Sequence, residues 1–64
     1  MKEIANHKVE FVFTDDLGKD IFTMFFDGFK TPVSITKFYL LLMSNNPDYS
    51  IRIGSIQKTV IKNG

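Results

Sequence analysis

The chain has 64 residues, of which 44% are hydrophobic and 23% are charged, and its formal net charge is +1. This length accommodates a single domain, and the balanced charge excludes both the strongly basic composition of a dedicated duplex-DNA-binding protein and the acidic composition of a nucleic-acid mimic. Because the sequence contains no cysteine, disulfides, cysteine-ligated zinc and thiol catalysis are excluded as well.

Neither a membrane segment nor a secretory leader is expected. No apolar run approaches the roughly 18 residues that a membrane-spanning helix needs, and no charged segment precedes a short apolar one at the N-terminus. We therefore expect a cytoplasmic protein. A domain of about 60 residues buries only about 60% of the surface of its unfolded chain, and this one carries seven Phe and two Tyr. We expect a second chain to complete its core.

The N-terminal part predicts a short frayed segment followed by a strand. Residues 1–6 show no periodicity and are expected to fray. Residues 8–14 alternate between polar and apolar side chains and place Val9, Phe11 and Phe13 on one face. A period of two with aromatic and β-branched residues is typical of a strand.

Acidic residues and a glycine predict a tight turn after this strand. A three-residue loop at 16–18, with Gly18 in the left-handed region, is a common hairpin connection. It would place Asp15 opposite Lys19 and lead into a second strand over residues 20–26.

The register of this hairpin determines which residues of the second strand face the core. With the predicted loop, Phe13 pairs with Ile21 and the opposite side of the strand presents Phe22, Met24 and Phe26. We call these last three residues the Phe22 row. Both faces of the hairpin then carry apolar side chains that need cover.

A change of period predicts a helix in the middle of the chain. Thr31 is a good N-cap and Pro32 suits the first helical position. The helix is expected to end at residues 45–47 (Asn-Asn-Pro), because the residue before a proline avoids the helical conformation. Leu40 falls outside the main apolar stripe. The residues that recur at helical spacing are Ile35, Phe38, Tyr39 and Leu42.

The C-terminal part predicts a second hairpin. Residues 49–53 and 56–62 alternate on either side of Gly54 and Ser55, and a Gly-Ser pair is typical of a two-residue turn. The alternative is one bent strand with a bulge at Gly54. The favoured fold is α+β, ββαββ, with an antiparallel sheet of two hairpins and one helix packed on one face; the strand order stays open.

No group of residues predicts catalysis, a metal site or a cofactor site. His7 is the sole imidazole, and Glu10 lies on the opposite side of the same strand. Asp15, Asp16 and Asp20 resemble a calcium loop in composition but lack its spacing. No serine has a neighbouring base, and the glycines are isolated. We therefore predict a protein that is not an enzyme.

The Phe22 row is the most informative feature, because one helix can cover only one face of the sheet. We expect the row on the uncovered face, with Leu40 as a secondary contact, unless another strand order buries it in the monomer. An exposed apolar patch marks an interaction site. It would serve a homodimer, another protein partner, or stacking of single-stranded nucleic acid. Phosphate contacts for the last would come from Lys8, Arg52, Lys58 and Lys62.

The homodimer is favoured among these alternatives. Aromatic residues are common in interface cores, and the near-neutral charge argues against nucleic acid. Residues 21–26 contain neither a charge nor a proline, so an uncovered edge there would be prone to aggregation without a partner. The sequence thus predicts a small, non-catalytic protein–protein interaction module, homodimeric, with a regulatory or inhibitory role.

Overall fold

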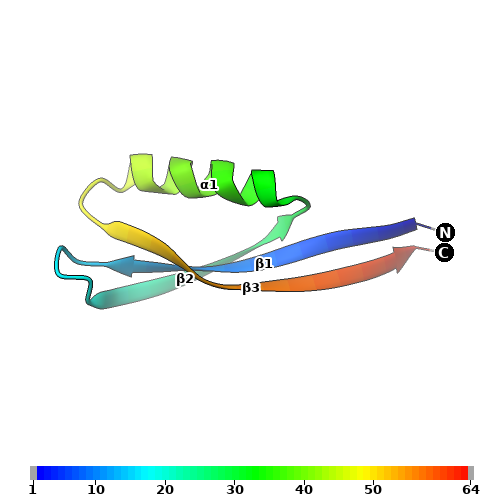
Figure 1. Cartoon of the computed structure of the whole chain (residues 1–64), viewed down its shortest axis with the longest axis horizontal. Helices are drawn as coiled ribbons and strands as arrows, with labels where there is room; N and C mark the ends of the chain where they lie inside the picture. The colour runs from blue at the N-terminus through cyan, green and yellow to red at the C-terminus, as the bar shows by residue number, and fades with distance from the viewer. Residues whose placement is uncertain (1, 64) are drawn as a thin grey trace.

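Three antiparallel strands and one helix make up the fold. The structure is a computed structural model that describes the backbone of residues 2–63 and the side chains of residues 5–60. The elements are β1 (Lys2–Thr14), β2 (Asp20–Phe29), α1 (Pro32–Asn45) and β3 (Ser50–Asn63). The strand order is β2-β1-β3, and α1 lies along one face of the sheet (Figure 1). We call this face the helix side and the other the open face.

The expected four-stranded sheet is wrong, because the predicted second hairpin is one continuous strand. Glu10 of β1 lies opposite both Gly54 and Ser55, where the β1–β3 register shifts by one residue. This is a bulge, the alternative that the sequence left open. A Cβ at position 54 would overlap the Glu10 carboxylate and lie 3.1 Å from Cγ2 of Val12. Glycine here therefore leaves room for the side chains of Glu10 and Val12 to lie over β3, rather than forming a turn.

Residues 2–6, part of the segment expected to fray, belong to β1, and Met1 lies outside the described residues. These residues pair with residues 59–63 of β3, because β3 runs on as a single strand long enough to reach them. Together the two segments form a two-stranded ribbon that extends past α1 and β2 (Figure 1). The molecule measures 48 × 18 × 12 Å, and its radius of gyration is 13.8 Å, against about 11 Å for a compact chain of this length.

The predicted turn between β1 and β2 is confirmed. The amide of Asp15 donates to the carbonyl of Lys19 at 3.0 Å, and the amide of Gly18 donates to the carbonyl of Asp15 at 3.1 Å. Gly18 has a φ of +81°. The Asp15 carboxylate also accepts hydrogen bonds from the amides of Leu17 and Lys19, so this aspartate orders the loop.

A bulge at Ile21 reverses the faces of β2. Pairing follows the predicted register as far as Asp20, but Phe22, and not Ile21, then lies opposite Phe13. Successive side chains in a strand point to opposite faces, so one additional residue exchanges the faces of everything after it. The Phe22 row therefore lies on the helix side, and the expectation that it occupies the uncovered face is wrong.

The predicted helix is confirmed at both ends. Thr31 is the N-cap: its hydroxyl accepts from the amide of Ser34 at 3.2 Å, and the Ser34 hydroxyl accepts from the amide of Thr31 at 3.3 Å. Pro32 begins the helix, as predicted. At the other end the Asn46 side chain donates to the carbonyl of Leu42 at 2.8 Å. α1 is neither long nor apolar enough to cross a membrane.

The core is an aromatic layer between α1 and the middle of the sheet. The ring of Phe11, on the central strand, has four aromatic neighbours with centroids 5.6–6.4 Å away. Tyr39 of α1 is one of them, and its hydroxyl donates to the carbonyl of Ile51 in β3. The predicted helical stripe thus faces the sheet. The buried members of this cluster are Val9, Phe11, Phe13, Ile35 and Ile51, of which the first three are fully buried.

Candidate interaction site

The titratable residues singled out in the sequence do not converge on one site. Nδ1 of the half-buried His7 donates to the carbonyl of Phe29 at 3.0 Å, which joins the end of β2 to β1. Glu10 belongs to the other side of the strand, as predicted. Within residues 5–60, no three His, Cys, Asp or Glu side chains lie close enough to hold a metal ion, and the part of the chain that the structure describes has no pocket.

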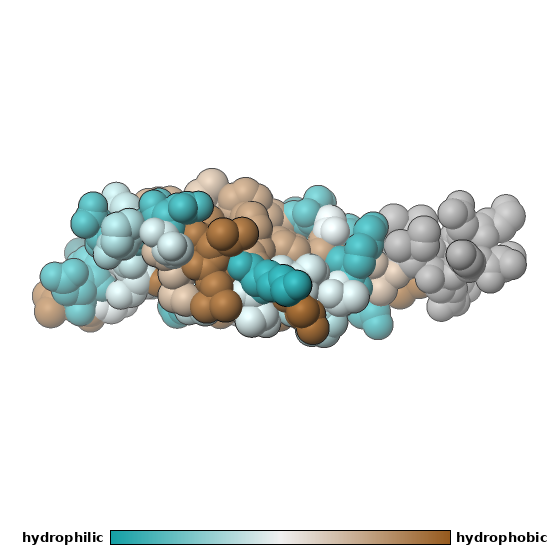
Figure 2. All heavy atoms as spheres, turned by 90° about the horizontal axis from the view of Figure 1, so that it is seen from above, coloured by the Kyte–Doolittle hydropathy of each residue, from teal (hydrophilic) through white to brown (hydrophobic). Residues whose placement is uncertain are grey.

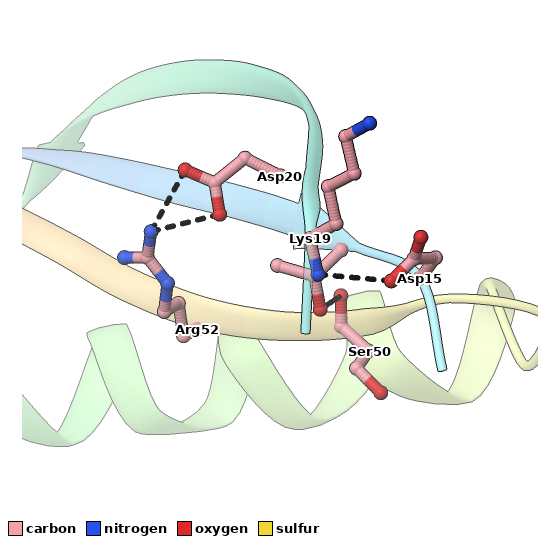
Figure 3. A network of polar contacts seen from close by, with 6 residues as sticks. Asp15, Lys19, Asp20, Ser50 and Arg52 are labelled. Carbon is pink, nitrogen blue, oxygen red and sulfur yellow. Dashed lines mark hydrogen bonds and ion pairs between the residues drawn. The ribbon is translucent and has the colours of Figure 1, made fainter. Parts of the chain in front are cut away.

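The acidic residues near the first turn are used separately. Asp15 binds loop amides, whereas Asp20 forms an ion pair on the open face (Figure 3). Nη2 of Arg52 lies 2.9 and 3.0 Å from the two carboxylate oxygens of Asp20. Both side chains are more than half exposed. The pair therefore joins the two outer strands across β1 rather than forming a cation site.

The Phe22 row is divided between the core and the surface. Phe26 is half-buried, and its ring lies 4.9 Å from that of Phe38 on α1. Phe22 stacks on Phe13 with ring centroids 4.4 Å apart, yet 40% of it stays exposed, as does 39% of Met24. The helix thus covers one end of the row and leaves two residues at the edge of the sheet.

The helix continues this apolar surface on its β2 side. Phe38 packs on β2 and Tyr39 is bonded to β3. Residues three apart share a helix side, so Leu41 belongs to the β2 side with Phe38, while Leu40 lies about 160° around the helix from the half-buried Leu42, on the side away from the sheet. Leu41 is 60% exposed and Leu40 56%. Figure 2, which views the helix side, shows hydrophobic residues exposed there with hydrophilic ones between them. We call Phe22, Met24 and Leu41 the β2 flank.

The β2 flank contains no charged residue, and the opposite flank does. On β3, exposed Ile53 and Ile56 are followed on the same side by Lys58, which pairs with His7. On the open face of β2, Phe25 is 55% exposed, and Nζ of Lys8 lies 5.5 Å from its ring centroid. Within residues 5–60, the β2 flank combines exposed apolar side chains with the uncharged strand segment 21–26, and Lys37 lies one turn before Leu41 on the same side of α1.

The residues expected to contact nucleic acid are not brought together. Lys8 and Arg52 lie on the open face, the latter held by Asp20, whereas Lys58 lies on the helix side. The side chain of Lys62 lies outside the described residues. Because the Phe22 row faces away from Lys8 and Arg52, the expected platform of aromatic rings beside cations is not formed.

Leu41 is the functional candidate that the sequence missed. A signal was present, because six consecutive apolar or aromatic residues, 38–43, exceed what a helix with one buried stripe needs. Leu40, predicted as a secondary contact, is exposed but lies on the side of α1 away from the sheet. No protein-family model, no curated protein and no solved structure matches this chain, so its function has to be argued from this surface.

Proposed function

We propose that this protein is a small, non-catalytic protein–protein interaction module that acts as a homodimer. The observation that supports it is the β2 flank, where three large apolar side chains stay 39–60% exposed directly beside the core. Contiguous exposed apolar surface on a small protein is typical of an interaction site. A regulatory or inhibitory role would then be exerted by binding.

A second copy suits this flank because the flank is uncharged. A twofold axis brings the same side chains together from both copies. A charged residue in this surface would therefore lie near the identical charge of the second copy and be repelled by it. The β2 flank has none, whereas the surface around Ile56 ends at Lys58. Contact through Phe22, Met24 and Leu41 therefore brings no like charges together, whereas Lys37, one turn before Leu41 on the same side of α1, has to lie outside that contact.

Apolar burial alone gives a weak dimer. Covering a Leu, Met or Phe side chain completely contributes about 1.5–3 kcal/mol, so covering the exposed half of six such side chains contributes about 6 kcal/mol. Association costs about 4–15 kcal/mol in lost freedom. The flank by itself only balances this cost, and a stable dimer needs a second source of contacts at the same place.

Sedimentation velocity over about 1–500 µM tests the proposal, a range in which weak homodimers dissociate. We expect the wild type to shift from monomer to dimer. Leu41→Lys should shift the transition to higher concentration, because it places a charge on the flank. Leu40→Lys is the matched control, since Leu40 is similarly exposed on α1, 56% against 60%, but lies on the side away from the sheet. A wild type that stays monomeric throughout would refute the homodimer.

A further inference from the structure

We propose that two copies pair through the outer edges of β2, antiparallel and about a twofold axis at Met24. The two three-stranded sheets would then form one six-stranded sheet, with β2 of each copy at its centre. This inference rests on the proposed homodimer and specifies its geometry. It also supplies the second source of contacts, namely backbone hydrogen bonds between the two strands.

The outer edge of β2 is open over residues 22–26, and this segment has neither a charge nor a proline to protect it. β2 is an edge strand of the sheet, and natural proteins protect such edges with charges, prolines or short strands. β2 has ten residues, and residues 21–26 contain neither a charge nor a proline. The other edge strand, β3, carries Arg52 near its start and Lys58 near its middle. Of the two edges, β2 is the one suited to pairing.

Two bulges delimit the part of β2 that can pair regularly. Ile21 is the additional residue at one end, and Asp27 with Gly28 lies opposite the single residue Lys8 at the other. Residues 22–26 between them follow an uninterrupted register with β1. These five residues therefore form a regular strand segment whose side chains alternate between the two faces, and its midpoint is Met24.

Pairing about Met24 places each residue of this segment opposite a residue of the second copy that points to the same face of the sheet. Phe22 of each copy then lies opposite Phe26 of the other, and Thr23 of each copy lies opposite Phe25. A shift of one residue would set helix-side residues against open-face ones, and a shift of two would bring a bulge into the ladder. In the Met24-centred register aromatic rings pair across the seam, and Leu41 of each copy flanks it on the helix side.

The exposed area is close to what a specific dimer needs. A Phe side chain presents about 150–250 Å², so each half-exposed ring offers about 100 Å². Two rings and three aliphatic side chains of about this exposed area from each copy give on the order of 1,000 Å² if they are covered completely, which is the lower limit for a specific interface. The side chains that contribute are Ile21, Phe22, Met24, Phe25 and Leu41.

Disulfide trapping tests the register, because the chain has no cysteine of its own. Met24→Cys would place two thiols opposite each other at a Cα separation of about 4.5–5.5 Å, within the range that a disulfide spans. Ile56→Cys is the matched control, being 51% exposed on the other edge strand. Under mild oxidation at about 10 µM, we expect the Met24→Cys dimer to form at least about tenfold faster, because pairing raises the effective thiol concentration.

Exchange of backbone amides in the wild type provides a test that needs no substitution. Raising the concentration through the dimer transition should slow deuterium uptake in residues 22–26 and leave residues 56–60 unchanged. Two results would overturn this geometry and leave the homodimer intact, provided that the wild type dimerises. One is faster disulfide trapping of Ile56→Cys than of Met24→Cys, and the other is slower deuterium uptake in residues 56–60 instead of residues 22–26. A wild type that is monomeric at all concentrations would overturn both.

Discussion

The bulge at Ile21 predicts opposite roles for two neighbouring phenylalanines. Phe26 lies on the helix side, half-buried, with its ring 6.0 Å from Phe11 and 4.9 Å from Phe38. Phe25 lies on the open face, 55% exposed, with Lys8 over its ring. Without the bulge the two would exchange positions, so replacing each by alanine reports directly on the register.

The expected costs follow from these contacts. Removing a fully buried Phe costs about 3–5 kcal/mol; Phe26 is half-buried but has two edge-to-face partners, so we expect Phe26→Ala to lose about 2–3 kcal/mol. For Phe25→Ala we expect about 0.5–1 kcal/mol, because little area is buried and the contact with Lys8 contributes about 0.5 kcal/mol.

Urea and thermal unfolding followed by circular dichroism would measure both losses, at a concentration low enough for the wild type to be monomeric. Each kcal/mol corresponds to about 4–8 °C in Tm for a domain of this size. Phe26→Ala should therefore melt about 10–20 °C below the wild type, and Phe25→Ala only a few degrees below it. If Phe25→Ala were the more damaging of the two, β2 would have the register without the bulge and the assignment of faces would be refuted.

Three further substitutions test other contacts. Gly54→Ala should destabilise by about 1–3 kcal/mol, as overpacking does, and the loss should shrink when Glu10→Ala is added; additive losses in this double-mutant cycle would contradict the close approach. Arg52→Gln should cost less than about 1 kcal/mol because its pair with Asp20 is exposed, and a dependence on salt that is equal to that of the wild type would show that the pair contributes nothing. Asp15→Ala should cost about 1–2 kcal/mol by removing two hydrogen bonds to loop amides, measured by chemical denaturation; an unchanged midpoint would contradict the role of Asp15 in the turn.

Local signals in the sequence predicted the turn and the helix correctly. The Thr31 cap with its following proline and the Asp15–Gly18 loop depend on neighbouring residues only, and both have the predicted hydrogen bonds. Such motifs satisfy their own backbone groups, so tertiary context leaves them unchanged. The helix boundaries and the buried helical stripe were also predicted from residues that are close together in the sequence.

The positions of the two bulges, at Ile21 and opposite Glu10, could not be predicted from neighbouring residues alone. Ile21 and Phe22 are both large, apolar and suited to a strand, so alternation alone does not indicate which of them is the additional residue. At Gly54 the same dipeptide fits a turn and a bulge, and the choice depends on β1 being long enough to pair along the whole of β3. The location of the interaction site depends on which residue forms the bulge, because a shift of one residue moves the Phe22 row to the other face.

The ribbon formed by the ends of β1 and β3 makes the chain nearly circular. Lys2 lies directly opposite Asn63, so a linker of a few residues would join them, and new ends could be opened beside Leu17 in the exposed turn. A covalent ring of this size would remove about 4 kcal/mol of unfolded-state freedom in the chain-entropy treatment. Such a permuted or cyclised version leaves the edge of β2 untouched, and it offers a rigid frame on which that edge can be varied.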